Sequence, residues 1–227
     1  MNKSSINKEY WEKNIEGFSG FYDINSEEKI LGNKLFTWFY KEFLFPVEKK
    51  YMYDRHRYVC DFIAKNVNAK TRAADIGCGS GVYVLKMLES RADFVYAFDY
   101  AKSAIDLTKK NLSESNQEKI EYKIFDITEH KIPKVDLAIS IGVLPYIESI
   151  ETYLENILPN TDSFFFNYLD SNHFVNKIRR NIGFLDVRKY SYHNLDEILR
   201  VPAMQDFRLI NKIKLASGWI LEVKRKQ

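Results

Sequence analysis

The feature that most constrains the fold of this chain is the glycine-rich stretch from residue 73 to residue 83, Ala-Ala-Asp-Ile-Gly-Cys-Gly-Ser-Gly-Val-Tyr. Small and apolar residues lead into Asp75, three glycines follow at alternate positions, and apolar residues at helical spacing begin directly afterwards. Glycine permits positive φ and lets a ligand lie against the main chain, while the next helix offers unpaired N–H groups. The stretch therefore predicts a strand, a tight loop and a helix that bind a small nucleotide-like ligand. A plain turn between a strand and a helix is the alternative, but it rarely needs three glycines.

This stretch resembles the first motif of the class I S-adenosylmethionine-dependent methyltransferases, an acidic residue followed by Gly-x-Gly-x-Gly. The dinucleotide fingerprint Gly-x-Gly-x-x-Gly would require a glycine where Val82 stands, so the spacing favours S-adenosylmethionine over NAD. The resemblance implies an α/β fold with a doubly wound, mostly parallel seven-stranded sheet of the Rossmann-like kind. It also implies an S-adenosylmethionine site that includes Asp75, Gly77, Cys78 and Gly79.

Length and composition favour one soluble α/β domain with an extension. The chain has 227 residues, of which 45% are hydrophobic, and a formal net charge of only +3. This charge gives no field that argues for a nucleic-acid partner. The two cysteines lack the spacing of a zinc site and favour a reducing compartment, so no metal is expected. No apolar run reaches the roughly 18 residues of a membrane span, and no signal-peptide core precedes the domain, which favours a cytoplasmic protein.

Residues 1–69 are expected to form an N-terminal helical cap, and residues 70–227 the methyltransferase domain. The first segment is rich in aromatic residues near helical spacing, until Pro46 interrupts the pattern. A cluster of arginines and tyrosines follows, in which Tyr51 and Arg57 could grip a ligand carboxylate, since guanidinium binds carboxylate in a bidentate manner. A solvated helix face explains the same cluster equally well.

The second and third strands, expected at residues 94–99 and 120–127, each place an acidic residue near the carboxyl end. Asp99 lies about 20 residues beyond the glycines, where an acid accepts hydrogen bonds from ribose hydroxyls, and Tyr100 adjoins it. The resemblance assigns Asp126 and Ile127 to the adenine, the acid bonding the exocyclic amine and the apolar residue packing on the ring. A turn or helix cap is the alternative for Asp126. A helix capped near Ser103 separates the two strands.

The loop after the fourth strand, residues 141–147, should face the transferred methyl group and begins at Ile141 beside the cofactor. It lacks the Asn-Pro-Pro-Tyr type of signature found in methyltransferases of amide or adenine amino groups. Beyond the fifth strand, at residues 163–168, His173 is a candidate general base, because imidazole titrates near working pH. Tyr146 and His193 are weaker candidates, and a structural role for His173 is the alternative. A nearby basic and aromatic cluster could hold an anionic group of the acceptor, or simply be solvated: Lys177, Arg179, Arg180, Arg188, Lys189, Tyr190 and Tyr192.

The predicted function is methyl transfer from S-adenosylmethionine to an oxygen or nitrogen of a small polar acceptor. A sugar, a nucleotide-linked sugar or a secondary metabolite, with or without an anionic group, fits this description. Two other classes stay open at this point: an NAD-dependent oxidoreductase on a related sheet, and a non-catalytic S-adenosylmethionine-binding protein. The sequence leaves the oligomeric state open, and it predicts a closing antiparallel pair of strands near residues 207–215 and 219–224.

Overall fold

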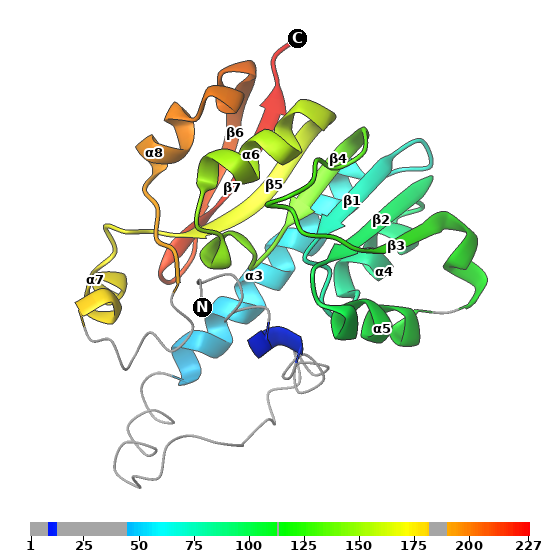
Figure 1. The fold of residues 1–227 in the computed structure, drawn as a ribbon, viewed down its shortest axis with the longest axis horizontal. Helices are drawn as coiled ribbons and strands as arrows, with labels where there is room; N and C mark the ends of the chain where they lie inside the picture. Colours follow the sequence, from blue (N-terminus) through cyan, green and yellow to red (C-terminus); the bar gives the residue numbers. More distant parts are fainter. Residues whose placement is uncertain (1–8, 13–44, 113, 182–189) are drawn as a thin grey trace, which may run out of the picture.

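The computed structural model describes residues 9–12, 45–112, 114–181 and 190–227 (Figure 1). Residues 9–12 form a helical turn, called here the N-terminal turn. The main elements that follow are α3 (Phe45–Asn66), β1 (Arg72–Ile76), α4 (Val82–Glu89), β2 (Phe94–Asp99), α5 (Lys102–Asn111), β3 (Ile120–Ile124), β4 (Val135–Ser140), α6 (Ile150–Ile157), β5 (Thr161–Leu169), α7 (Phe174–Asn181), α8 (Leu195–Arg200), β6 (Phe207–Lys214) and β7 (Gly218–Arg225).

The seven strands form one sheet in the order β3-β2-β1-β4-β5-β7-β6. Strands β1 to β5 pair in parallel, whereas β7 runs antiparallel to both β5 and β6. The expected doubly wound, mostly parallel seven-stranded sheet is confirmed, and so is its closing hairpin. The chain moves outward from β1 to β3 and then returns to the other side of β1 as β4. Open α/β sheets bind ligands beyond the carboxyl ends of the strands at this reversal, which lies between β1 and β4.

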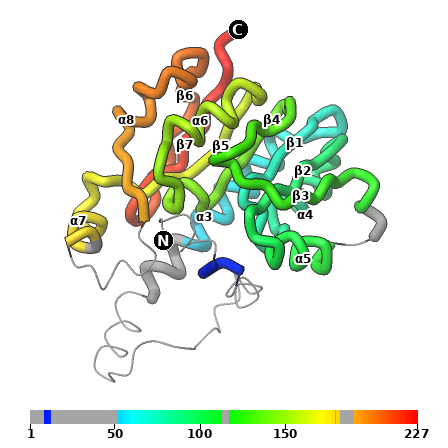
Figure 2. The backbone as a smooth tube through the Cα atoms, viewed as in Figure 1, coloured from blue at the N-terminus to red at the C-terminus, as the bar shows by residue number. Residues whose placement is uncertain are grey.

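Helices cover both faces of the sheet, which makes a three-layered molecule (Figure 1, Figure 2). On one face, Tyr153 of α6 packs in a core cluster with Phe164 and Phe166 of β5. On the other face, Phe62 of α3 stacks on Phe165 with ring centroids 4.0 Å apart, in a second cluster shared with α4 and α5. Successive strand residues point to opposite faces, so the apolar run of β5 supplies both layers.

Helix α3 belongs to this second layer through the buried residues Val59, Phe62 and Ile63. The sequence predicted that Pro46 interrupts the preceding helical pattern; that pattern lies outside the described residues, and α3 runs from Phe45 to Asn66 with Pro46 in its first turn. Proline is tolerated there, since the first N–H groups of a helix have no partner within the helix. The division of the chain at residue 69 stays a prediction, and the rest of the predicted cap lies outside the described residues except for the N-terminal turn.

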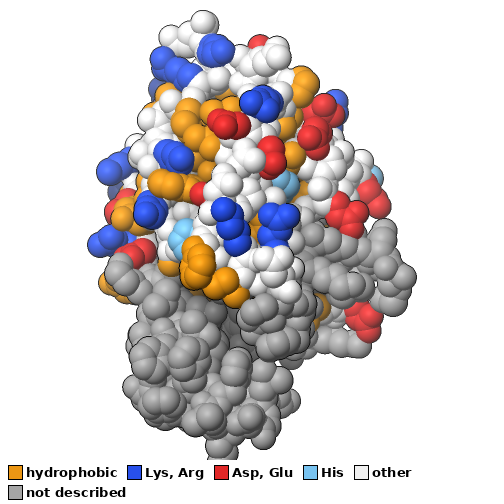
Figure 3. All heavy atoms as spheres, turned by 90° about the vertical axis from the view of Figure 1, so that its left-hand side faces the viewer, with side chains coloured by type: hydrophobic (Ala, Val, Ile, Leu, Met, Phe, Trp, Pro, Cys, Tyr) orange, Lys and Arg blue, Asp and Glu red, His pale blue; other side chains and the backbone are white. Residues whose placement is uncertain are grey.

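Three features of the described residues bear on the expected partners: the surface charge, the length and apolarity of the helices, and the grouping of metal-binding side chains. The view from the side of α7 and α8 shows Lys and Arg side chains spread among hydrophobic and acidic ones (Figure 3). None of the described helices is long and apolar enough to cross a membrane. Across the described ranges, no three His, Cys, Asp or Glu side chains gather as a metal site would require.

Candidate functional site

The glycine loop lies between β1 and α4, and all three of its glycines have positive φ: +77° at Gly77, +56° at Gly79 and +82° at Gly81. A Cβ atom on Gly77 would lie 2.2 Å from a methyl carbon of Val143, and one on Gly81 would lie 2.7 Å from Thr108. These two glycines are therefore required by packing within the protein. A Cβ atom on Gly79 would meet none of the described residues within 4 Å. Gly79 thus leaves an open surface where a ligand can approach the main chain.

Asp75 is the penultimate residue of β1, just before this loop, and is only 1% exposed. Neither of its carboxyl oxygens has a hydrogen-bond partner among the described residues. Burial, together with the nearby negative charge of Asp99, raises the pKa of Asp75 to about 8. A buried carboxyl group without partners is costly, and a cationic or hydrogen-donating ligand would relieve that cost. The site therefore has an unfilled acceptor at its base.

Asp99, at the end of β2, accepts hydrogen bonds from two backbone N–H groups, one of them in the glycine loop. The Gly79 N–H donates to Oδ2 at 3.1 Å, and the Ala101 N–H donates to Oδ1 at 3.0 Å. Burial raises the pKa of Asp99 to about 6, although these hydrogen bonds act in the opposite direction. Carboxylate oxygens accept more than one hydrogen bond each, so Asp99 can hold the loop and still accept from a ligand hydroxyl.

The N-terminal turn contacts the same region, which the sequence did not indicate. Glu12 accepts hydrogen bonds from the Lys102 and Ser103 N–H groups, at 2.8 and 3.2 Å. The prediction of a helix cap near Ser103 was wrong, because α5 begins at Lys102 with Ala101 at the cap position and without a side-chain cap bond there. The carboxylate of Glu12 takes that role from a distant part of the chain.

Trp11 of the N-terminal turn joins the two sides of the crevice. It packs against an apolar cluster formed by Ala101, Ala104 and Leu107 at the start of α5. Its ring also meets the ring of Tyr146 edge-on, with centroids 5.6 Å apart. Tyr146 belongs to the loop after β4, so the turn spans from the end of β2 to the end of β4.

A pocket of about 280 Å³ lies beyond β4 and β5 and is lined by Glu148, Arg180, Tyr190, Ser191, Tyr192 and His193. The ring of Tyr146 approaches that of Tyr190, with centroids 5.4 Å apart. The guanidinium of Arg180 lies over the ring of Tyr192 at 6.0 Å. The pocket combines a cation, an anion, two phenols and an imidazole, which suits a small polar molecule.

Comparison with known proteins bears on the class of protein to which the chain is similar. Residues 74–160, which include the glycine loop, Asp99 and Asp126, match the family model of a methyltransferase domain. This stretch of the chain is therefore similar to a methyltransferase domain. The expected sheet topology is confirmed, and the match to a methyltransferase domain agrees with the expected family.

Two curated proteins resemble parts of the methyltransferase domain. Over 92 residues, or 38% of the chain, the sequence is 36% identical to the probable cobalt-precorrin-6B C(15)-methyltransferase (decarboxylating) of Methanococcus vannielii. Over 51 residues, or 22% of the chain, it is 43% identical to the protein of the same description from Methanocaldococcus jannaschii. The chain spans 51% and 27% of the lengths of these relatives.

Solved structures extend the likeness to the whole fold. The magnesium protoporphyrin IX methyltransferase of Synechocystis with bound S-adenosylhomocysteine has a TM-score of 0.72 and 14% identity, covering 99% of this chain and 100% of its own. The N-methyltransferase NodS of Bradyrhizobium japonicum, also with S-adenosylhomocysteine, has a TM-score of 0.60 and 13% identity, covering 78% and 88%. At such low identity these structures support the fold alone.

Around the cofactor crevice of the methyltransferase domain, the structure brings several predicted residues together. The hydroxyl of Tyr100 is buried without a partner among the described residues, and burial raises the pKa of this phenol. Asp126 forms a turn, since its Oδ1 accepts from the N–H and the hydroxyl of Thr128 at 2.9 and 2.7 Å. Ile127 is buried in the core on the α6 side, and Ile141 is buried in the core on the α3 side.

Cys78 of the glycine loop is buried, and its Sγ lies 3.5 Å from the hydroxyl of Thr108. The same hydroxyl donates to the Gly79 carbonyl at 2.9 Å, so α5 fixes the loop from behind. Burial, followed by the charges of Asp99 and Asp75, raises the pKa of the Cys78 thiol. Cys78 is therefore a small packing residue of the loop and stays protonated.

Helix α3 places Arg55 beside the site, whereas the sequence predicted Arg57. The side chain of Arg57 is 54% exposed and lies 3.6 Å from Asp54. Arg55 is 6% exposed, and a Cβ atom on Gly142 would lie 3.5 Å from its Nη1. The sequence of the helical segment before residue 58 does not show which of its faces is buried, and for this reason Arg55 was not predicted. The side chain of Tyr51 lies outside the described residues.

The role of His173 as a base stays a prediction, and the structure places this residue directly before α7. His173 precedes α7, where its carbonyl accepts the Lys177 N–H at 3.0 Å and its own N–H donates to the Asp170 carbonyl at 3.1 Å. Of the predicted basic cluster, Arg180 lines the pocket and Lys177 is exposed, while Arg188 and Lys189 lie outside the described residues. His193, by contrast, is buried in the pocket wall.

Proposed function

We propose that the protein transfers a methyl group from S-adenosylmethionine to an oxygen or nitrogen of a small polar acceptor. The observation that carries this proposal is the open approach to Gly79 above the unpartnered carboxyl group of Asp75, at the reversal point of the sheet. An ammonium group on the ligand satisfies Asp75, and the main chain of the loop admits a ligand at van der Waals distance. The methionine part of S-adenosylmethionine carries such an ammonium group.

The remaining cofactor contacts follow from the chemistry of the crevice. The ribose hydroxyls are assigned to Asp99, which has acceptor capacity left after its two backbone bonds. The adenine is assigned to the region of Tyr100, Asp126 and Ile127. For the methionine carboxylate, buried Arg55 is a better candidate than exposed Arg57, because guanidinium bonds gain strength away from water.

The reaction itself needs alignment more than it needs a specialised catalyst. The acceptor attacks the methyl carbon, the carbon–sulfur bond breaks, and its electron pair neutralises the sulfonium. Charge disappears in the transition state, so a pocket sheltered from water favours it. Trp11 and Tyr146, which meet across the crevice, would exclude water from the reacting atoms.

The acceptor is proposed to be a small molecule that enters the pocket beyond β4 and β5. The volume of this pocket, about 280 Å³, is close to the lower end of the roughly 300–1,000 Å³ typical of small-molecule sites. It would hold a small acceptor whole, or one end of a larger one. Sugars and secondary metabolites fit this size, and the names of the relatives add precorrins and porphyrins as acceptors to be tested.

Replacing Asp99 with alanine is expected to weaken S-adenosylmethionine binding by at least about tenfold, because each hydrogen bond to a charged group contributes roughly 1.5–3 kcal/mol. Calorimetric titration with S-adenosylmethionine, S-adenosylhomocysteine and NAD measures this effect and tests the class of cofactor. Asp136→Ala is the matched control, since Asp136 also accepts a backbone N–H, from Arg72 at 2.7 Å, but lies at the amino end of β4.

The outcomes separate the alternatives. Binding of the two methionine derivatives, lost in Asp99→Ala and kept in Asp136→Ala, supports the assignment. Preferential binding of NAD would refute it in favour of an oxidoreductase. Tight S-adenosylmethionine binding with no methyl transfer to any acceptor in a broad metabolite panel would favour a non-catalytic binding protein.

A further inference from the structure

The pocket lined by Tyr190 to His193 is built into the reaction end of the sheet. The Ser191 N–H donates to the Pro145 carbonyl at 2.6 Å, and the Ser191 hydroxyl donates to the Ile147 carbonyl. The His193 N–H donates to the Leu169 carbonyl at 3.0 Å. The segment is thus attached both to the loop after β4 and to the carboxyl end of β5, which fixes the pocket relative to these strands.

The same loop after β4 also forms part of the cofactor crevice. Its Val143 side chain lies against Gly77 of the glycine loop, and its Tyr146 ring contacts the ring of Tyr190. One short loop therefore borders both the proposed cofactor and the pocket. A molecule in the pocket would approach the transferred methyl group from the β4 side, as the proposed function requires.

His193 lies in the pocket wall beside a carboxylate that is itself held in place. Its Nδ1 is 3.9 Å from Oε2 of Glu197, and the imidazole is 9% exposed. The same Oε2 accepts the Asn194 N–H at 3.0 Å, while the Asn194 side chain accepts the Glu197 N–H at 2.9 Å. This reciprocal capping box begins α8 and fixes the carboxylate next to the imidazole.

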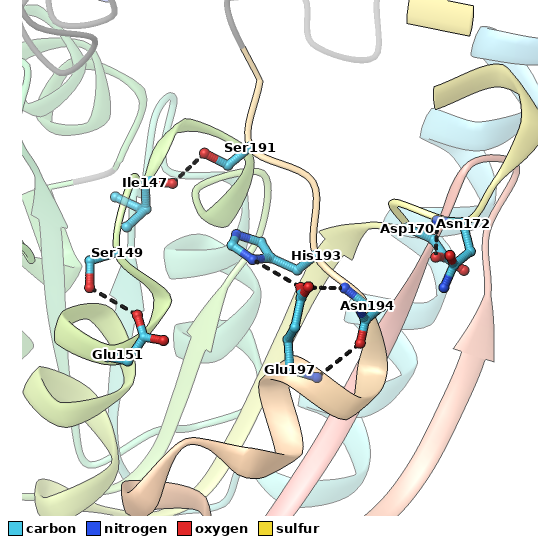
Figure 4. Close-up of polar contacts among 9 residues, drawn as sticks. All are labelled: Ile147, Ser149, Glu151, Asp170, Asn172, Ser191, His193, Asn194 and Glu197. Carbon is cyan, nitrogen blue, oxygen red and sulfur yellow. Dashed lines mark hydrogen bonds and ion pairs between the residues drawn. The ribbon is translucent and has the colours of Figure 1, made fainter. Parts of the chain in front are cut away.

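The close-up shows what this arrangement does to the ring. Nδ1 of His193 faces Glu197, while the second ring nitrogen is turned to the other side, toward Ser191 and Ile147 (Figure 4). A carboxylate at one ring nitrogen stabilises imidazolium, so the imidazole can accept a proton at its opposite nitrogen when a hydroxyl group reaches it. Among the described residues, the charged groups around the pocket are Glu197 from α8, Arg180 from α7 and Glu148 after the loop of β4.

We propose that this pocket binds a hydroxyl-bearing acceptor with a carboxylate or phosphate group, and that His193, positioned by Glu197, is the general base. The inference rests on the proposed methyl transfer. Arg180, which lies over the Tyr192 ring, binds the anionic group of the acceptor. The acceptor oxygen attacks the methyl carbon, the electrons of the carbon–sulfur bond pass to sulfur, and the hydroxyl proton passes to Nε2 of His193. The imidazolium then returns the proton to water.

The first test is nuclear magnetic resonance of the full chain with isotopically labelled histidine, which gives four imidazoles to assign by substitution. Glu197→Gln keeps the capping box but removes the charge, so the pKa of His193 should fall, whereas Glu151→Gln should leave it unchanged. Glu151 is the matched control because it also stands in the first turn of a helix, where it accepts from the hydroxyl of the N-cap Ser149 (Figure 4).

The second arm uses para-hydroxybenzoate as the probe, with para-hydroxybenzamide as its uncharged counterpart and inorganic phosphate as the bare anion. The benzoate and phosphate should shift the His193 resonances, the benzamide should do so much less, and Arg180→Gln should abolish the difference. No response of His193 to either anion at millimolar concentration would overturn the assignment of the pocket. An unchanged His193 titration in Glu197→Gln would overturn the role of the carboxylate.

Activity gives the third arm, with the acceptor that the wild-type protein methylates best. His193→Gln should lower kcat by about 100-fold with unchanged S-adenosylmethionine affinity, whereas His173→Gln should retain wild-type turnover. Glu197→Gln should move the acidic limb of the kcat profile to lower pH. Full turnover in His193→Gln would refute the base while leaving methyl transfer intact. Failure of the wild type to bind S-adenosylmethionine would instead refute the proposed function.

Discussion

Replacing Gly79 with valine is expected to abolish measurable S-adenosylmethionine binding, with a loss of more than about 100-fold. The added carbons would occupy the open surface at which the ligand is proposed to touch the main chain. The fold should survive, because a Cβ atom at this position meets no atom of the described residues within 4 Å. Its cost is the positive φ, about 1–2 kcal/mol. Calorimetric titration gives the affinity, and denaturant unfolding gives the stability.

Gly77→Ala is the informative comparison for this variant. Its Cβ atom would lie 2.2 Å from a methyl carbon of Val143, in addition to the strain of a positive φ. It should therefore lower the free energy of unfolding by more than Gly79→Val does, although it adds fewer atoms. If Gly79→Val bound S-adenosylmethionine within threefold of the wild type, the ligand would not lie against this residue and the proposed cofactor position would be wrong.

Asp75→Asn should have effects of opposite sign on binding and on stability. It removes the carboxylate charge that we propose pairs with the ammonium group of the ligand, so the affinity for S-adenosylmethionine should fall about 10- to 100-fold. It should also raise the unfolding free energy of the ligand-free protein at pH 8, by on the order of 2 kcal/mol. The reason is that the wild type must keep a buried carboxyl group, with a pKa of about 8, without partners.

The pH dependence of the stability follows from the raised pKa of Asp75. The pKa of Asp75 is raised above its ordinary value of 3.8 to about 8, so the folded state binds a proton that the unfolded chain releases. The contribution of this group to stability is complete below about pH 4 and is lost as pH rises toward 8. The stability difference between the wild type and Asp75→Asn should therefore grow over that range. A stability difference that does not change with pH would contradict the raised pKa of Asp75.

Ligand binding supplies a second readout for the same residue. Pairing with an ammonium group favours the ionised carboxylate, so binding at pH 7 should release protons from the wild type. Titrations in buffers of different ionisation enthalpy measure this release. Asp75→Asn should lose most of it, while the part due to Asp99, with a pKa of about 6, should remain.

Local patterns in the sequence were sufficient for the framework of the sheet. Buried parallel strands have continuous apolar runs, and Asp75 and Asp99 stand near the carboxyl ends of β1 and β2, where ligands bind in open α/β sheets. Three glycines at alternate positions fixed the loop and the class of cofactor. Each of these signals lies within a few residues of the structure that it predicts, so no knowledge of the tertiary contacts was needed.

The residues that were missed depend on contacts between distant segments. Arg55 rather than Arg57 is buried because of how α3 is rotated against the sheet, which its own sequence does not determine. Glu12 caps α5 across 90 residues of sequence, so no local pattern could have revealed it. His193 was a weaker candidate in the sequence, and its proposed role as a base rests on the hydrogen bonds that attach its segment to β5 and to the loop after β4.

The N-terminal turn has a consequence for the order in which the molecule is made. Glu12 and Trp11 leave the ribosome long before their partners, since Lys102 and Tyr146 follow 90 and more residues later. Loop-closure entropy also makes such distant contacts slower to form than local ones. During synthesis the crevice must therefore stay uncovered until the loop after β4 has emerged. A nascent chain stalled before Tyr146 would lack the aromatic contact that spans the crevice, whatever the state of its first three strands.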